Sequence, residues 1–227
     1  MRVVAIVQAR MTSRRLPGKV LMDLAGAPLL AQELRRLRRA ETIDDIVVAT
    51  TVNETDDPVA DLAAAEGVRV FRGDEHDVLG RYLGAAAEAH SDVVVRITAD
   101  CPLIDPAVVD RVVRALEPDV DYASNVVTRT FPRGLDCEAL HRDTLERVGR
   151  QATSAPAREH VTWLINEERP QLFVRRSVTD EQDNSDLSWT VDEPADLELV
   201  RRLYERLGLA ASALGYELII ASVRADH

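Results

Sequence analysis

The chain has 227 residues, of which 46% are hydrophobic and 30% charged, as in an ordinary soluble globule. Its formal charge of −11 argues against a nucleic-acid partner held through phosphate contacts, although a small anion responds only to its local site. No apolar stretch approaches a membrane span, and Cys101 and Cys137 make neither a disulfide framework nor a metal cluster. We therefore expect a cytoplasmic protein with reduced thiols and neither a membrane nor a nucleic-acid partner.

The first 120 residues alternate short apolar runs with longer amphipathic ones. Runs rich in Val and Ile predict strands at Val3–Val7, Asp45–Thr50, Val68–Phe71 and Asp92–Thr98. Helical spacing of apolar residues predicts helices at Pro28–Arg39, Pro58–Glu66 and Val78–His90. Asp57-Pro58 and Asp105-Pro106 each place a capping carboxylate before a proline. The alternation predicts an α/β fold with a doubly wound, mostly parallel sheet, whose ligands bind beyond the carboxyl ends of the strands.

The pattern becomes less regular after residue 121. We predict two short strands within Asn125–Leu140, helices at Arg142–Gln151 and Pro156–Glu167, strands at Leu172–Val178 and Leu187–Val191, and a last helix at Pro194–Leu207. The expected organisation is a single domain over residues 1–227, with an inserted α+β excursion over residues 125–180.

Lys19 is the only lysine among the 28 lysine and arginine residues. It lies at the end of a run, residues 8–19, that leaves the carboxyl end of the first predicted strand. A lysine ammonium is a compact charge on a flexible stem and suits phosphate oxygens. The alternative is that this lysine is a chance survivor in an arginine-rich sequence.

The same run concentrates the groups that a phosphate site needs. It contains four cations, two hydroxyl donors and a glycine that allows close backbone approach, namely Arg10, Arg14, Arg15, Lys19, Thr12, Ser13 and Gly18. The spacing is neither the Walker A pattern nor G-x-G-x-x-G. The run therefore predicts a phosphate-binding loop, and a solvated basic turn is the alternative.

The run QARMTSRRLPGKV, residues 8–20, resembles the signature loop of the CMP-sugar synthetases, which activate acidic sugars such as 3-deoxy-manno-octulosonate and the sialic acids with CTP. The nearer resemblance is to the spore-coat polysaccharide biosynthesis protein F branch of these cytidylyltransferases. Further motifs follow in the family's order, at Ile46–Thr50, Val70–Gly73, Asp77–Leu79, Arg96–Asp105, Gly134–Asp136, Arg158–Thr162 and Thr190–Asp192. Together they cover nearly the whole chain.

The resemblance implies a Rossmann-like, GT-A-like nucleotidyltransferase fold, CTP as substrate, Mg²⁺ as cofactor and a homodimer. It also implies that the excursion carries acceptor or dimer contacts. One departure is Val7-Gln-Ala-Arg10, where well-characterised synthetases usually read I-P-A-R. This departure bears on the acceptor more than on the nucleotide chemistry.

Asp100 and Asp192 each follow a predicted strand, so we expect them at the edge where the Lys19 loop emerges. Mg²⁺ takes hard oxygen ligands, typically one or two carboxylates with substrate phosphates and water. By resemblance, the two residues match the metal-binding aspartates of the sugar-acid cytidylyltransferases. The alternative is that each caps a turn or a helix, the role that we assign to Asp57 and Asp105.

The implied reaction is attack of an acceptor oxygen on the α-phosphorus of the triphosphate, with release of pyrophosphate. Positioning and charge stabilisation then dominate catalysis, and Arg10 and Lys19 are the predicted catalytic residues. The predicted nucleotide-binding residues are Gln8, Ala9, Arg10, Ser13, Arg15, Gly18, Lys19, Arg72 and Asp100. Arg72 is the candidate for reading the base, with a surface ion pair as the alternative. Cys101 is predicted to be a buried filler rather than a nucleophile.

The predicted acceptor-binding residues are Arg133, Asp136, Glu138, Arg158 and His160. Consecutive helical residues diverge by about 100°, so residues 158–160 cannot all face one ligand. We expect Arg158 or His160 to face the acceptor and Glu159 to brace another side chain, with a structural histidine as the alternative. Arg133 is suited to an acceptor carboxylate or phosphonate.

The leading interpretation is a Mg²⁺-dependent cytidylyltransferase that acts on an acidic sugar or a similar acidic metabolite. One alternative keeps the fold and changes the substrates to a phosphonate or another nucleoside triphosphate. A non-catalytic nucleotide sensor is the alternative from another class, and pyrophosphate release separates it from an enzyme. A glycosyltransferase is disfavoured because no Asp-x-Asp pair follows a predicted strand.

Overall fold

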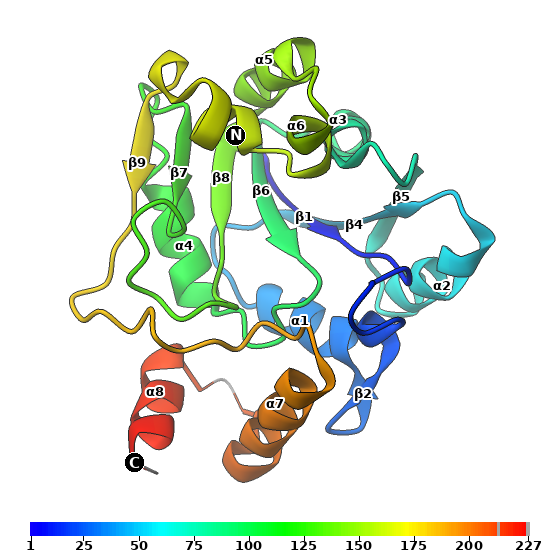
Figure 1. Cartoon of the computed structure of the whole chain (residues 1–227), viewed down its shortest axis with the longest axis vertical. Coiled ribbons are helices and arrows are strands. Elements are labelled where there is room, and N and C mark those ends of the chain that lie inside the picture. The colour runs from blue at the N-terminus through cyan, green and yellow to red at the C-terminus, as the bar shows by residue number, and fades with distance from the viewer. Residues whose placement is uncertain (213, 226–227) are drawn as a thin grey trace.

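A computed structural model describes residues 1–212 and 214–225. Its core is a seven-stranded sheet in the order β5-β4-β1-β6-β8-β7-β9 (Figure 1). The strands are β1 (Val3–Gln8), β4 (Asp45–Thr51), β5 (Arg69–Gly73), β6 (Val93–Thr98), β7 (Tyr122–Ser124), β8 (Glu138–His141) and β9 (Arg175–Ser177). β8 runs antiparallel to both of its neighbours, and the other pairings are parallel. The predicted doubly wound, mostly parallel sheet is confirmed.

The inner strands are apolar on both faces because helices cover both sides of the sheet. Ala5 and Val7 face a core shared with α1 (Leu29–Leu37), α2 (Asp57–Ala65) and α4 (Pro106–Arg114). Val4 and Ile6 face the opposite core, with α3 (Val78–Glu88), α5 (Arg142–Gln151) and α6 (Ala155–Glu159). Strands buried on both faces read as continuous apolar runs, which is the pattern that identified them in the sequence.

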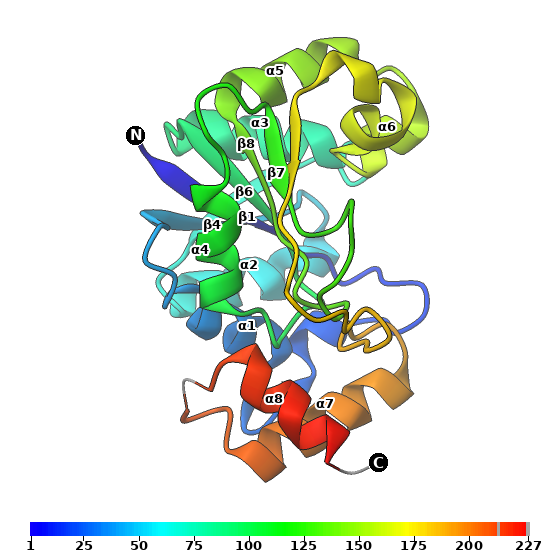
Figure 2. The same cartoon turned by 90° about the vertical axis from the view of Figure 1, so that its left-hand side faces the viewer.

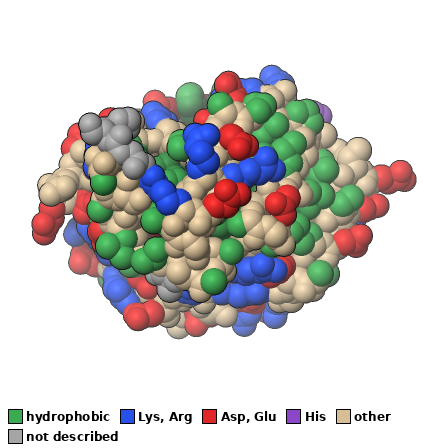
Figure 3. Space-filling model, turned by 90° about the horizontal axis from the view of Figure 1, so that it is seen from below, with side chains coloured by type: hydrophobic (Ala, Val, Ile, Leu, Met, Phe, Trp, Pro, Cys, Tyr) green, Lys and Arg blue, Asp and Glu red, His purple; other side chains and the backbone are tan. Residues whose placement is uncertain are grey.

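A third core lies beneath α7 (Pro194–Leu207) and α8 (Tyr216–Arg224), at one end of the molecule (Figure 2). It contains Leu103, Phe131 and Trp189. Seen from this end, acidic and basic side chains are interspersed among apolar ones (Figure 3). Among the described residues, no helix combines the length and the apolar composition that a bilayer crossing requires.

Most predicted elements agree with the structure to within a few residues, and α5 and α7 have the predicted bounds. The sequence reasoning missed α8 and the small hairpin of β2 (Asp23–Leu24) and β3 (Ala27–Pro28). The strands predicted within Asn125–Leu140 are also displaced, since β7 ends before this range and β8 begins only at Glu138. Within residues 125–180, β8 and β9 belong to the central sheet, and the acceptor or dimer role of this stretch remains a prediction.

The helix predicted at Pro156–Glu167 is wrong, because the chain breaks after α6. Val161 has φ +50°, a left-handed conformation that a β-branched residue rarely adopts, and its side chain is 1% exposed. Burial in the core around α3 and α5 therefore fixes a turn that the apolar spacing did not predict. A separate π-helical turn follows at Leu164–Glu168.

The strand predicted at Leu187–Val191 is also wrong. A single bridge joins Ser188 to Arg133, and the N–H of Val191 donates to the carbonyl of Asp100 at 2.8 Å. The next N–H, that of Asp192, donates to Asp196 Oδ2 in the first turn of α7 at 3.0 Å. The segment is thus extended, but its backbone bonds to the loops that contain Arg133 and Asp100 and to the first turn of α7, and it forms no strand ladder.

The two predicted caps have different outcomes. Asp105 caps α4 and accepts from the N–H groups of Ala107 and Val108, as predicted. Asp57 is not the cap of α2, because the N-cap position belongs to Asp56.

Gly134 has φ +98°, and a Cβ there would lie 2.8 Å from the carbonyl carbon of Trp189. Gly208 provides a matched control, with φ +60° and nothing within 4 Å of the equivalent position. We expect Gly208→Ala to cost about 1–2 kcal/mol for the left-handed conformation alone. Gly134→Ala adds backbone overlap and is expected to cost more than about 3 kcal/mol. Urea unfolding followed by tryptophan fluorescence measures both losses, and equal losses would contradict the packing argument.

Candidate active site

A buried aspartate anchors the loop that follows β1. Asp56 is fully buried, and its carboxylate accepts the N–H of Met11 at 2.7 Å and the hydroxyl of Thr51. The N–H of Gly18, which has φ +73°, donates to the Met11 carbonyl at 2.9 Å. The loop is thereby folded back on itself, and Lys19 is placed at the carboxyl edge of the sheet.

The ammonium of Lys19 joins three distant parts of the chain. Nζ lies 2.9 Å from Asp100 Oδ2, 3.0 Å from Asp192 Oδ1 and 2.7 Å from the carbonyl oxygen of Val191. Burial alone would lower the pKa of Lys19, but the charges and hydrogen bonds of the two aspartates outweigh it and raise the pKa above its ordinary value. The lysine is therefore charged, and it neutralises a pair of carboxylates that would otherwise repel each other.

The outer oxygens of both aspartates have partners of their own. Asp100 Oδ1 accepts the hydroxyl of Thr98 at 2.6 Å. Asp192 Oδ2 lies 2.7 Å from Arg15 Nη2, whose side chain is 60% exposed. Each carboxylate is consequently held at both of its oxygens, one of which bonds to Lys19.

This cluster borders a cleft made of two adjoining cavities of about 320 Å³ each. The predicted residues that the structure brings together along the cleft are Gln8, Ala9, Arg10, Ser13, Arg15, Lys19, Asp100, Asp192 and His160. Arg14, which belongs to the same loop, lines it as well. Four cations of one loop thus face a single cleft, as an anionic ligand requires.

Gly18 contributes the turn of the loop and is not among the lining residues. Arg72 also lies outside the cleft: it donates to the carbonyls of Thr51 and Asn53, at 2.8 and 2.9 Å, and pairs with Asp57 at 2.7 Å. This arrangement matches the surface ion pair that was the alternative to base reading.

Four predicted acceptor residues lie outside the two cavities. Arg133 is exposed, and its backbone pairs with the segment before α7. Asp136 makes a two-pronged ion pair with Arg129, at 2.6 and 2.9 Å.

Glu138 is buried between Arg96 and the hydroxyl of Tyr122. Arg158 pairs with Asp77 at the start of α3. Only His160 of this group reaches the cleft, where its ring lies 5.7 Å from that of Trp163.

Sequence reasoning missed Arg81, and it gave Glu159, which also lines the cleft, a different role. Glu159 lines both cavities, and no hydrogen bond or ion pair of its carboxylate occurs among residues 1–212 and 214–225, so it does not brace another side chain as expected. Arg81 is 2% exposed, donates to the carbonyls of Asp74 and Glu75, and lines one cavity. No pattern in the sequence marked it, because Arg81 lies within α3 and packing decides which helix residues reach the cleft.

A further buried carboxyl lies behind Asp100. Glu33, on α1, is fully buried, and its Oε2 accepts the N–H of Cys101 at 3.2 Å, while Oε1 has no hydrogen-bond partner in the part of the chain that the structure describes. Burial, and then the charge of Asp100, raise the pKa of Glu33 well above its ordinary value. Burial likewise raises the pKa of the Cys101 thiol, which agrees with its predicted role as a filler.

The donor set around Lys19 fits a divalent cation bound together with substrate phosphates. Two carboxylate oxygens and one carbonyl converge on a point that a cationic nitrogen now fills. No group of three or more His, Cys, Asp or Glu residues in the described part of the chain is placed to hold a metal. Mg²⁺ commonly uses one or two carboxylates with phosphate oxygens, so two aspartates are sufficient.

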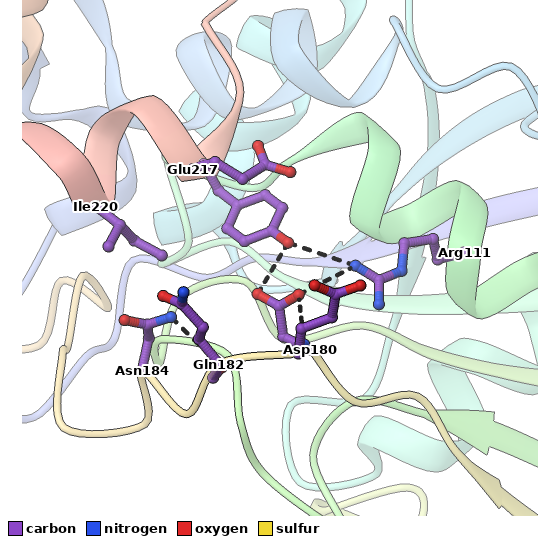
Figure 4. Close-up of a pocket in the computed structure, with 8 residues that line it drawn as sticks. Arg111, Asp180, Gln182, Asn184, Glu217 and Ile220 are labelled. Atoms are coloured by element: carbon purple, nitrogen blue, oxygen red, sulfur yellow. Dashed lines mark hydrogen bonds and ion pairs between the residues drawn. The ribbon is translucent and has the colours of Figure 1, made fainter.

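A separate cavity, of about 550 Å³, lies between α4, α8 and residues 180–184 (Figure 4). Its polar groups bond to one another: the Tyr216 hydroxyl donates to Asp180 at 2.9 Å, and Arg111 lies 3.6 Å from the same carboxylate. We assign it no role in the chemistry of the cleft.

Comparison with known proteins agrees with this geometry. A family model described as cytidylyltransferase matches residues 4–214. The chain belongs to the cytidylyltransferase family. The spore coat polysaccharide biosynthesis protein SpsF of Bacillus subtilis is 32% identical over 224 residues, which cover 96% of this chain and 92% of that protein. The resemblance inferred from the sequence motifs is confirmed.

Two further proteins support the assignment. The 3-deoxy-manno-octulosonate cytidylyltransferase of Anaeromyxobacter sp. is 37% identical over 150 residues, which cover 65% of this chain and 57% of that enzyme. A cytidylyltransferase structure from Leptospira borgpetersenii superposes with a TM-score of 0.94 at 31% identity, and covers 100% of this chain and 95% of that one.

Asp56 is expected to determine the loop conformation of this cytidylyltransferase. Asp56→Ala leaves the N–H of Met11 and the hydroxyl of Thr51 without an acceptor, and we expect a loss of about 2–4 kcal/mol. Asp57→Ala, the adjacent control, removes a half-exposed ion pair and is expected to cost less than about 1 kcal/mol. Urea unfolding of both variants checks this, and a larger loss in Asp57→Ala would overturn the assignment.

Glu33 makes the stability of the cytidylyltransferase depend on pH. Because the folded pKa is raised, the folded state keeps a proton that the unfolded chain releases near its ordinary value of 4.5. Stability therefore falls as pH rises from about 4.5 through the folded pKa, by at most about 1.4 kcal/mol per pH unit. Glu33→Gln removes this titration and is expected to lose less stability between pH 5 and 8 in urea unfolding. Parallel pH profiles of the two proteins would contradict the prediction.

Proposed function

We propose that this cytidylyltransferase transfers CMP from CTP to an acidic sugar or a similar acidic metabolite, with Mg²⁺ as cofactor, and releases pyrophosphate. The observation that carries the proposal is the Lys19–Asp100–Asp192 cluster at the border of a cleft lined by arginines. A carboxylate pair beside a basic loop suits a nucleoside triphosphate and a divalent cation together.

In the proposed reaction an acceptor oxygen attacks the α-phosphorus, and the bond to the β-phosphate breaks. Arg10, Arg14 and Arg15 hold the phosphate oxygens, and with Lys19 they stabilise the charge that develops on pyrophosphate. When bound, Mg²⁺ is held by Asp100 and Asp192 and supplies further neutralisation of phosphate charge. No side chain needs to form a covalent intermediate, in keeping with the buried, protonated Cys101.

Two considerations support an acidic acceptor. The relatives above include a 3-deoxy-manno-octulosonate cytidylyltransferase and a spore coat polysaccharide biosynthesis protein. In addition, His160 and Arg81 line the cleft beyond the loop cations. A phosphonate acceptor, or another nucleoside triphosphate, would use the same cluster, so the assay below compares both.

The proposal retains the cytoplasmic location and the homodimer expected from the sequence. Nucleoside triphosphates are made in the cytoplasm, and both cysteines are free and buried. Sedimentation velocity of the purified protein tests the dimer.

Nucleotide choice is tested by thermal unfolding with CTP, UTP, ATP or GTP plus Mg²⁺. A ligand at a hundred times its Kd adds about 2.7 kcal/mol, which for this chain length raises Tm by about 5–11 °C. We expect this rise with CTP. Pyrophosphate release is then measured with 3-deoxy-manno-octulosonate, N-acetylneuraminate or a phosphonate as acceptor.

Asp100→Asn is expected to reduce the rate of pyrophosphate release at least about 100-fold, because loss of one group that stabilises charge in the transition state typically has an effect of this size. Asp186→Asn, which alters a surface pair with Arg224, is the control and is expected to retain activity. If Tm rises only with UTP, ATP or GTP, that nucleotide replaces CTP as the proposed substrate. Full activity of Asp100→Asn would refute the assigned site.

A further inference from the structure

All three N–H groups of the Lys19 ammonium already have acceptors within the protein. An ammonium has three N–H groups, and those of Lys19 point to Asp100 Oδ2, Asp192 Oδ1 and the Val191 carbonyl, at 2.9, 3.0 and 2.7 Å. The side chain is only 10% exposed. In this arrangement Lys19 has no N–H left for a phosphate, although its loop is the one that would bind the nucleotide.

Lys19 also takes the two carboxylate oxygens that a metal would need. The other two are held elsewhere, Asp100 Oδ1 by Thr98 and Asp192 Oδ2 by Arg15. An ammonium and a divalent cation cannot share the same two oxygens, because the space is occupied and the like charges repel. One of the two cations must therefore be absent whenever the other is bound to both aspartates.

We propose that Lys19 is a resident cation that must leave Asp100 and Asp192 before a divalent cation can bind to both, and that it then moves to the phosphates of the nucleotide. The phosphate destination rests on the proposed function, whereas the competition for the carboxylates does not. A flexible four-carbon stem with a compact head suits such a move better than the planar fork of arginine. This accounts for the lysine at position 19 in a chain whose other basic side chains, counted as Lys and Arg, are all arginines.

The exchange makes metal and nucleotide binding depend on each other. The apparent affinity for a metal alone is reduced by the fraction of molecules in which Lys19 has left the aspartates. A nucleotide that attracts Lys19 raises this fraction, and by linkage the metal raises the affinity for the nucleotide by the same factor. The enzyme would then bind both ligands together and the free metal only weakly.

Mn²⁺ binding without nucleotide, measured by electron paramagnetic resonance of the free ion, tests the competition. If Lys19 is absent from the aspartates in about a tenth of molecules or fewer, Lys19→Met binds Mn²⁺ at least about tenfold more tightly than wild type. Arg14→Met is the matched control, since Arg14 lines the same cleft and makes no ion pair among the described residues. Removal of its exposed charge is expected to change Mn²⁺ affinity less than about fivefold. The double variant Lys19→Met/Asp100→Asn is expected to lose the gain.

Equal or weaker Mn²⁺ binding by folded Lys19→Met would overturn the proposal, and so would an equal gain in Arg14→Met. Wild-type protein provides a second test that does not depend on the folding of a variant. Incorporation of [6-¹³C]lysine labels Lys19 alone, because the chain has no other lysine. We expect its single ε-methylene signal to shift when CTP and Mg²⁺ are added together, and to shift far less with 1 mM Mg²⁺ alone.

An unchanged signal in protein whose Tm has risen with CTP and Mg²⁺ would show that Lys19 stays on the aspartates, and would overturn the move to phosphate. If no nucleotide raises Tm, the proposed function fails instead. The Mn²⁺ comparison would then still decide whether Lys19 competes for the carboxylates.

Discussion

The site depends on the neutralisation of two neighbouring carboxylates by one buried ammonium. Asp100 and Asp192 lie 81 and 173 residues beyond Lys19 in the sequence, and both bond to its Nζ. Without a cation between them, repulsion between the aspartates would oppose the contact of the loop after β1, the end of β6 and the segment before α7. Buried charges are tolerated when they are paired and hydrogen-bonded, and here every oxygen of both aspartates has a partner.

The sheet and α1 place these charges. Gln8 at the end of β1 is in register with Thr98 at the end of β6, so the two following loops begin side by side. The buried face of α1 then holds the segment after β6, because Glu33 accepts the N–H of Cys101 and Arg36 Nε donates to the carbonyl of Ile104 at 2.8 Å. Polar residues in a helix face that would otherwise be apolar thus position the segment that carries Asp100.

The sequence pattern predicted most strands and helices of the central sheet and its flanking layers, because apolar runs and helical spacing involve residues that are close in the sequence. Continuous Val and Ile runs identified the parallel strands, and the predicted bounds of α5 and α7 match the structure, with Pro194 at the first position of α7. Prediction failed where long-range packing overrides local preference. Val161 adopts a left-handed conformation inside the core and ends the helix that the spacing extended through it. Residues 187–191 form no strand, since their backbone bonds go to Arg133 and Asp100 in place of a neighbouring strand.

The sequence by itself determined the fold class, the family and the loop cations, because these depend on apolar periodicity and on consecutive residues whose spacing can be read directly. It also singled out Asp100 and Asp192, although the strand expected before Asp192 does not form. Only the tertiary structure decided which side chains reach the cleft. Glu159 and Arg81 line it, whereas Arg72, Arg158 and Glu138 are engaged in ion pairs outside it. A charged side chain is directed by its partner, and that partner is often tens of residues away, where no local pattern reveals it.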